Sequence, residues 1–417
     1  MLSSVQENFM EIVGYSVKLK KEETLKLNIH TPEQVKQLME MAKEQHMLSM
    51  VYDVVAHLQW NEACKKVIDS YKKQAVLFMM EQTRRTKMFL EIYNVLLEHD
   101  IKPVVVKGIV LRSMYPKPDC RYSNDEDLLI DKDDFWRCHN ILLNEGYRCE
   151  IDVDCFDKNV IPYEVAYFNT KTKVRMEIHT ELLPEEHRAF KGLNKKFNNS
   201  IYNAQQVNVG MGTVWTLNNT DHFLFLLSHS YKHFIYCGFG IRQLCDLLLM
   251  AEKCSDTIDW DYIENTVREN RIDKFLVNLM DIGEKYIGFD CNFIPLKYDI
   301  QPDSENLLDD MFDAGVFGKS SMGRIHSANI TMDAVDKSFA NKTARISIIN
   351  ALFPSKSYMK QNFSYLKKKK YLLPFAYCQR MAAYLKERKA RCGGTEETDS
   401  IAVGKRRMEL MRQYGVI

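Results

Sequence analysis

Two acidic residues in the segment Lys102–Ile130 constrain this chain more than any other feature of its sequence. The segment opens with a run of valines typical of a buried strand, turns at Lys107-Gly108, and continues as a short apolar helix. A second predicted strand, residues 125–130, then carries Asp125 and Asp127. Because side chains alternate between the two faces of a strand, these carboxylates point the same way. Converging carboxylates repel each other unless a cation lies between them, so the segment predicts a cation site.

A third acid, Glu177, lies on the clearest of the later strands. Residues 174–179 read VRMEIH, with apolar side chains on one face and Arg175, Glu177 and His179 on the other. If Glu177 converges with the two aspartates, the trio is typical of a two-metal phosphoryl-transfer site, in which Mg²⁺ or Mn²⁺ takes oxygen ligands. An exposed strand acid is the alternative interpretation of Glu177. We predict catalytic and metal-binding roles for Asp125, Asp127 and Glu177.

The turn at Lys107-Gly108 suits the binding of a phosphate. Glycine lets the backbone approach an anion closely, and the N–H groups that open the following helix face such an anion. Lys107 adds a point charge. The turn is therefore predicted to hold the triphosphate of a nucleotide.

Four regions are predicted along the chain, and the fold class is α+β. Residues 1–100 form an N-terminal helical region, with helix starts at Thr31-Pro32 and Asn61. Residues 101–215 form a mixed β-sheet core with helices, and residues 216–300 form a helical domain that closes the active-site cleft. Residues 301–417 form a mostly helical extension with a basic tail.

Composition excludes several classes of protein. A net charge of +1 over 417 residues argues against an extended nucleic-acid surface. No run of about 18 uncharged apolar residues occurs, so no membrane span is predicted. Eleven cysteines without CxxC pairs indicate reduced thiols, and the N-terminus does not resemble a signal peptide. These features predict a cytoplasmic protein.

The pattern of strand, glycine turn, helix and Asp-x-Asp, followed by a later acid, resembles the polymerase β-like nucleotidyltransferase superfamily. More closely, the chain resembles a poorly characterised bacterial nucleotidyltransferase family whose members read Leu-Lys-Gly, Tyr-Pro and Arg-x-x-x-Asp-x-Asp-Leu-Leu. The resemblance spans roughly residues 35–290 and includes a later acid-x-His element and a helical His-x-x-x-His stretch with a downstream Arg-x-x-x-Asp. The matching residues are Lys107, Gly108, Tyr115, Pro116, Arg121, Asp125, Asp127, Leu128, Leu129, Glu177, His179, His229, His233, Arg242 and Asp246.

This resemblance implies a metal-dependent enzyme that transfers a nucleoside monophosphate from a nucleoside triphosphate (NTP) to an acceptor and releases pyrophosphate. The acceptor is a small molecule, a peptide, a protein or an RNA end. Lys232, His233 and Arg242 are expected to close over the triphosphate. The alternatives are an inactive relative that binds a nucleotide or a partner, and a toxin-like transferase that acts on tRNA or protein. The expected substrate-binding residues are Lys107, Gly108, Arg121, Ser123, His179, Lys232, His233 and Arg242.

Several side chains have a second interpretation. His229 and His233 have the spacing of zinc ligands, although no third ligand is evident. Arg242 and Asp246 could instead form a helix-surface ion pair, and Arg121 and Arg175 could neutralise neighbouring acids rather than bind phosphate. Glu126 stands between the aspartates where the family has an apolar residue. It is predicted to face away from the metal site and to be paired or partly exposed.

Overall fold

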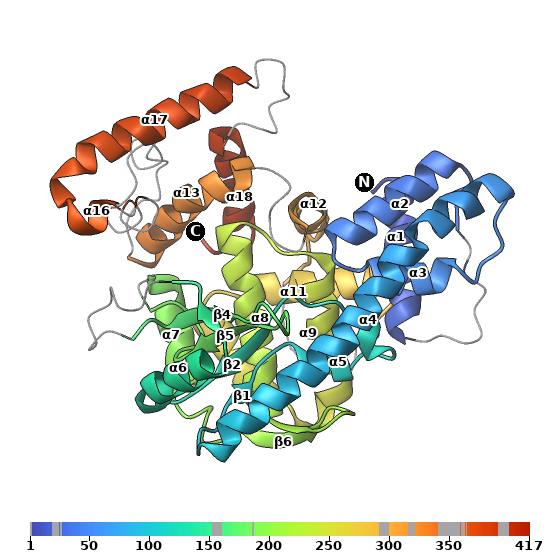
Figure 1. Ribbon diagram of the computed structural model, residues 1–417. Helices are drawn as coiled ribbons and strands as arrows, with labels where there is room; N and C mark the ends of the chain where they lie inside the picture. The colour runs from blue at the N-terminus through green and yellow to red at the C-terminus, as the bar shows by residue number, and fades with distance from the viewer. Residues whose placement is uncertain are drawn as a thin grey trace.

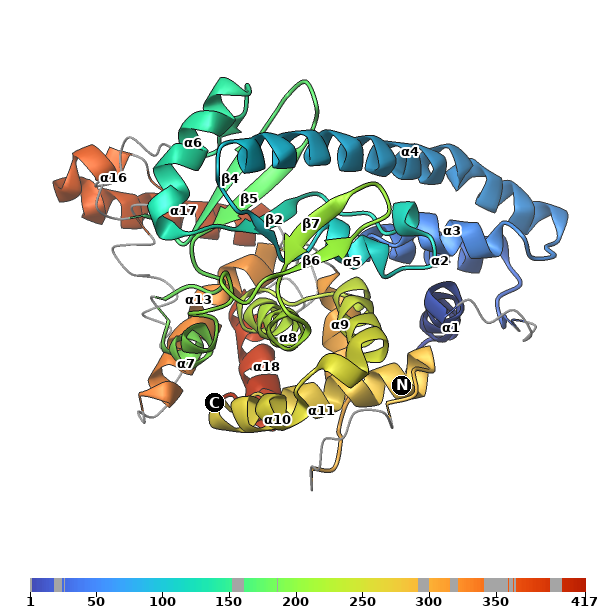
Figure 2. The same cartoon turned by 90° about the horizontal axis from the view of Figure 1, so that it is seen from below.

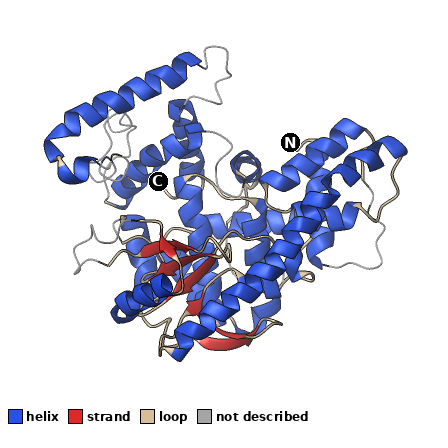
Figure 3. Cartoon of the chain, in the orientation of Figure 1, coloured by secondary structure: helices blue, strands red, loops and turns tan. Residues whose placement is uncertain are grey.

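The computed structural model describes residues 2–18, 25, 27–151, 161–185, 187–291, 300–315, 322–340, 359, 363, 365–390 and 400–417. The α+β prediction is confirmed, since helices surround one seven-stranded mixed sheet (Figures 1 and 3). Among these residues no helix is both long enough and apolar enough to cross a membrane.

Four helices precede the sheet: α1 (Ser4–Lys18), α2 (Pro32–Glu44), α3 (Leu48–Val55) and α4 (Glu62–Glu98). Both predicted helix starts are confirmed. Thr31 forms a capping box with Gln34 ahead of α2, and the Asn61 side chain accepts from the Cys64 N–H ahead of α4. A left-handed residue, His46, separates α2 from α3.

The sheet has the order β3-β4-β5-β2-β1-β7-β6. Strand β2 pairs antiparallel with β1 and parallel with β5, which places Asp127 directly opposite Glu177. Strand β2 is shorter than the strand predicted over 125–130, and Asp125 lies just before it. The strands are β1 (Val104–Val105), β2 (Glu126–Leu129), β3 (Arg148–Cys149), β4 (Glu164–Phe168), β5 (Arg175–His179), β6 (Gln205–Asn208) and β7 (Thr213–Thr216).

The two faces of the sheet have different partners (Figure 2). Helices α4 and α6 (Phe135–Asn144) cover one face, where Leu128, Met176 and Ile178 join their apolar side chains in a buried cluster. Helix α8 (Asn219–Tyr236) lies on the other face. Because β5 alternates, Glu177 and His179 point toward α8 while Met176 and Ile178 point into the core.

The remaining helices pack in two groups: most complete a second, larger core, and Leu366 and Ala376 belong to a small separate cluster. Arg324 of α13 pairs with Asp310 of α12 at 2.8 Å, and Arg407 of α18 donates to the Tyr236 carbonyl of α8 at 2.9 Å. These elements are α5 (Ile109–Ser113), α7 (Arg188–Lys196), α9 (Ile241–Cys254), α10 (Trp260–Glu269), α11 (Asp273–Ile282), the π-helical turn η5 (Gly283–Ile287), α12 (Glu305–Ala314), α13 (Met322–Phe339), α16 (Tyr365–Lys368), α17 (Leu373–Ala390) and α18 (Ser400–Gln413), with short 3₁₀ turns at η1 (Pro118–Cys120), η2 (Lys132–Asp134), η4 (Ser255–Thr257) and η6 (Lys370–Leu372).

Candidate active site

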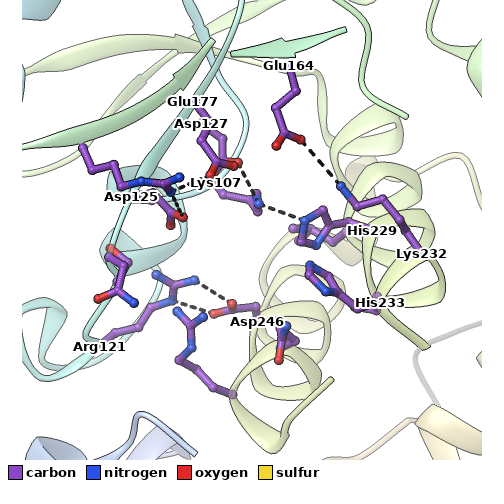
Figure 4. Close-up of a pocket in the computed structure, with 18 of the residues that line it drawn as sticks. Lys107, Arg121, Asp125, Asp127, Glu164, Glu177, His229, Lys232, His233 and Asp246 are labelled. Atoms are coloured by element: carbon purple, nitrogen blue, oxygen red, sulfur yellow. Dashed lines mark hydrogen bonds and ion pairs between the residues drawn. The ribbon is translucent and has the colours of Figure 1, made fainter. Parts of the chain in front are cut away.

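The three predicted acids line one cavity of about 610 Å³ between the sheet and α8 (Figure 4). Asp127 on β2 is 1% exposed, Glu177 lies opposite it on β5, and Asp125 approaches from the residue before β2. The prediction that the two aspartates face the same side is confirmed. The sequence-predicted residues Lys107, Gly108, Arg121, Ser123, Lys232, His233 and Arg242 also line this cavity.

Lys107 lies among the acids. Its Nζ is 2.8 Å from Asp127 Oδ1 and 3.0 Å from Nε2 of His229, which projects from α8. Because an ammonium can only donate, the His229 Nε2 must accept and the ring must be neutral. Burial and the nearby Lys107 also keep the pKa of His229 well below its usual value. In this arrangement Lys107 joins the sheet to α8.

The amide that opens α5 has a partner within the chain, contrary to the expectation that it would face a phosphate. Gly108 has φ of +57°, and the next amide, that of Ile109, donates to Glu126 Oε2 at 2.7 Å. The other Glu126 oxygen accepts from Arg112 Nη2 at 2.5 Å. Arg112 also donates to Ser123 Oγ, at 2.5 Å.

The prediction that Glu126 is paired is therefore confirmed, although it is buried rather than exposed, at 5%. It faces the core, while its two aspartate neighbours face the cavity. Two buried ions that complete each other's hydrogen bonds can occupy a core without an uncompensated charge. The Ser123 hydroxyl, predicted to bind substrate, accepts a hydrogen bond from Arg112.

Replacing Gly108 with alanine is expected to lower the free energy of unfolding more than the same change at Gly210. Both glycines have positive φ, which costs an alanine about 1–2 kcal/mol. A Cβ at Gly210 meets no atom within 4 Å, whereas one at Gly108 would overlap the Glu126 carboxylate. Displacing that carboxylate adds about 1–3 kcal/mol for broken buried hydrogen bonds. Thermal and urea unfolding of both variants measure the difference, and equal losses would contradict it.

Arg175 neutralises two of the acids. Its Nη1 lies 2.6 Å from Glu177 Oε1 and 3.3 Å from Asp125 Oδ2, while the rest of its guanidinium binds Glu150. This contact favours the interpretation of Arg175 as a neutralising charge over that of a phosphate ligand.

The acids have divergent proton affinities. Burial and the charges of Asp127 and Asp125 raise the pKa of Glu177 to about 7. Burial and the Asp127 charge also raise the pKa of Asp125. Burial acts in the same direction on Asp127, but Lys107 and His179 outweigh it and hold its pKa below the usual value. Asp127 is therefore the most firmly ionised member of the trio.

The donor set fits a divalent cation. Asp127, Glu177 and His179 each offer a ligand atom, and these atoms lie within 4.8 Å of one another. Carboxylate oxygens dominate the site once Asp125 is added, which suits Mg²⁺ or Mn²⁺. His179 Nε2 is 3.3 Å from Asp127 Oδ1, so the imidazole is placed to orient that carboxylate or to bind the ion beside it.

A basic region lies beside the acids. Arg121 donates through Nε and Nη2 to the two Asp246 oxygens, each at 2.6 Å, and the Tyr115 hydroxyl donates to the same carboxylate at 2.7 Å. Asp246 thus pairs with Arg121. The alternative interpretation, a helix-surface ion pair between Arg242 and Asp246, does not hold. Within the described structure, Arg121 Nη1 and Arg242 Nε are buried donors without a hydrogen-bond partner.

Helix α8 supplies the opposite wall. Lys232 Nζ lies 3.8 Å from Glu164 Oε2, and the rings of His229 and His233 lie 4.5 Å apart. Burial and the Lys232 charge keep the pKa of His233 well below its usual value. Neither histidine belongs to a group of potential metal ligands in the part of the chain that the structure describes, which argues against the zinc interpretation.

Glu164, Arg85 and Phe168 are among the cavity residues that the sequence reasoning missed. Glu164 of β4 lies opposite His179 across the β4–β5 pair. Its place at the start of an alternating strand was a usable signal. Arg85 of α4 donates to the carbonyls of Ser123 and Asn124 beside the acids, and Phe168 also lines the cavity. Nothing in the helical pattern of α4 marks Arg85 for this position.

Comparison with known proteins gives one match. The model of an uncharacterised nucleotidyltransferase family matches residues 31–288. No curated protein and no solved structure matches the chain. The matched residues include every side chain of the cavity described above.

Proposed function

The chain belongs to the family of uncharacterised nucleotidyltransferases, and we propose that it is an active, metal-dependent member. It transfers a nucleoside monophosphate from an NTP to an acceptor, which is a small molecule, a peptide, a protein or an RNA end. An oxygen of the acceptor bonds to the α-phosphorus, the bond to the β-phosphate oxygen breaks, and pyrophosphate leaves. A carboxylate of the site takes the acceptor's proton.

The observation that carries this proposal is the convergence of Asp125, Asp127 and Glu177 in a cavity that also holds unpartnered cationic donors. Gathering one buried and two partly buried carboxylates costs free energy, and a protein that serves only as a scaffold would gain nothing in return. Mg²⁺ bound there would neutralise the triphosphate and polarise the reacting oxygens. The carboxylates hold such an ion in place, and the basic region beside them faces the departing phosphates.

The donors of Arg121 and Arg242 suit phosphate oxygens. Asp246 and Tyr115 fix the Arg121 guanidinium in one orientation and leave Nη1 without a partner. A guanidinium held in this way loses little conformational freedom when it binds an anion. Lys232 of α8 adds positive charge from the opposite wall.

Replacing Arg242 with glutamine is expected to weaken NTP binding by about 10- to 100-fold, since a charge-assisted hydrogen bond contributes about 1.5–3 kcal/mol. Binding of the nucleoside monophosphate should change less, because it lacks the outer phosphates. Calorimetry with both ligands measures the two effects. Arg268→Gln, on the exposed side of α10 and outside the cavity, is the matched control. Equal weakening of NTP and monophosphate would contradict a role at the outer phosphates.

The proposed function is tested by calorimetric titration of the full chain with each of the four NTPs, in Mg²⁺ and in EDTA. Metal-dependent binding is expected. Incubation with α-labelled NTPs in a cell lysate then shows which molecule acquires label, and pyrophosphate release should accompany the transfer. Binding that is equally tight in EDTA, with no labelled product, would contradict the proposed activity and indicate a relative that only binds nucleotides. Label on tRNA or on a protein would identify the acceptor.

A further inference from the structure

The Lys107 ammonium is fixed inside the acidic cluster from two sides. Asp127 Oδ1 holds it from β2 at 2.8 Å, and His229 Nε2 holds it from α8 at 3.0 Å (Figure 4). Two of its three N–H donors are used in this way, which leaves one for a substrate oxygen. The side chain is 17% exposed, and the ammonium cannot leave this position without breaking both contacts.

Two basic side chains offset part of the negative charge of the cluster. Asp125, Asp127 and Glu177 carry three negative charges when ionised, and Lys107 and Arg175 contact them with two positive charges. Arg175 also pairs with Glu150, whereas the Lys107 ammonium contacts a single carboxylate, that of Asp127, and a neutral histidine. Lys107 is therefore the cation whose charge is not shared with an acid outside the trio.

The potential ligand atoms gather at one place beside Lys107. Asp127 Oδ1 is engaged by Lys107 and His179, and Glu177 Oε1 is engaged by Arg175. In the described part of the chain, one group of three potential metal ligands is found, Asp127 with Glu177 and His179, and Asp125 is not in it. This group offers a place for one ion, next to the Lys107 ammonium.

We propose that the site binds a single divalent ion together with its NTP, and that the Lys107 ammonium takes the place of a second one. This inference rests on the proposed function. With its remaining donor, Lys107 binds an oxygen of the reacting phosphate and stabilises the negative charge that develops there. Because Asp127 and His229 orient the ammonium in advance, it needs little reorganisation during the reaction.

The number of divalent ions bound per chain tests this proposal. Mn²⁺ is titrated into the full chain with a saturating non-hydrolysable NTP analogue, and bound Mn²⁺ is counted by electron paramagnetic resonance. One ion per chain is expected. Two ions per chain would overturn the inference and leave the proposed function standing. A failure of Mn²⁺ and the analogue to bind together would overturn both.

Variants at Lys107 test its role separately. Lys107→Met should raise the count from one Mn²⁺ to two, since the space and the negative charge become available to a second ion. Lys107→Arg should keep the count at one. Lys102→Met, which removes a lysine that contacts Ile201 and Trp215 outside the cavity, is the matched control. A count of one in folded Lys107→Met would overturn the assignment to Lys107. The wild-type count tests the inference even if this variant fails to fold.

Discussion

Replacing Asp127 with asparagine is expected to lower the rate of nucleotidyl transfer by about a thousandfold or more, the scale at which one essential electrostatic contact contributes to catalysis. Asp127 is the acid of the trio whose pKa is held below its usual value, so it is the most firmly ionised of the three at neutral pH. Asparagine keeps its size and removes its charge. Metal-dependent NTP binding by calorimetry and label transfer from an α-labelled NTP are the two measurements.

Asp133→Asn provides the matched control for this change. Asp133 is exposed in η2, shortly after β2, and lies outside the cavity. The control should bind and transfer as the wild type does, and circular dichroism should show both variants folded. Transfer by Asp127→Asn at even a tenth of the wild-type rate would contradict the assignment of Asp127 as an essential metal ligand.

Replacing Glu126 with alanine is expected to lower the free energy of unfolding by about 3–5 kcal/mol, the usual cost of leaving one partner of a buried ion pair alone. Arg112 is 2% exposed and would lose its carboxylate partner, and the Ile109 amide would lose its acceptor. Urea and thermal unfolding measure the loss. Because Ile109 follows the Lys107-Gly108 turn, metal-dependent NTP binding should weaken as well.

A double variant separates the lost pairing from the lost volume. Glu126→Leu with Arg112→Met replaces both ions by apolar side chains and should recover most of the stability, since no buried charge remains unpaired. Glu91→Ala, at an exposed position of α4, should change stability by less than about 0.5 kcal/mol. A loss below about 1 kcal/mol in Glu126→Ala would contradict the structural role of the pair.

The acidic trio could be predicted because its determinants are local. Alternation along a strand places Asp125 and Asp127 on one side of β2 and Glu177 on one side of β5, and a parallel pairing then brings the two strands together. The fold class followed from the same patterns, together with the helix caps at Thr31 and Asn61.

The partners of these residues depend on tertiary contacts that no local pattern contains. Glu126 was recognisable as an acid in a core strand, but its pairing with Arg112 depends on how α5 packs against β2. Glu164 reaches the cavity only through the β4–β5 pairing, and Arg85 only because α4 crosses the sheet. The amide that opens α5 was predicted to bind a phosphate. It binds Glu126 instead, because a buried carboxylate of the chain occupies that position.

Helix α4 connects the N-terminal helices with the acidic site. Its 37 residues span about 55 Å. The first half is buried with α2 and α3, through Cys64 and Ile68 among others, and the second half is buried on the sheet through Phe89 and Tyr93.

The middle of α4 forms hydrogen bonds with the loop that leads into β2. Gln82 accepts from the Ser123 amide at 2.9 Å, and Arg85 donates to the Ser123 and Asn124 carbonyls. A bound partner that tilts the N-terminal end of α4 is therefore expected to shift this loop, which lies next to Asp125. Through these contacts α4 links the N-terminal helices to the loop that leads to Asp125.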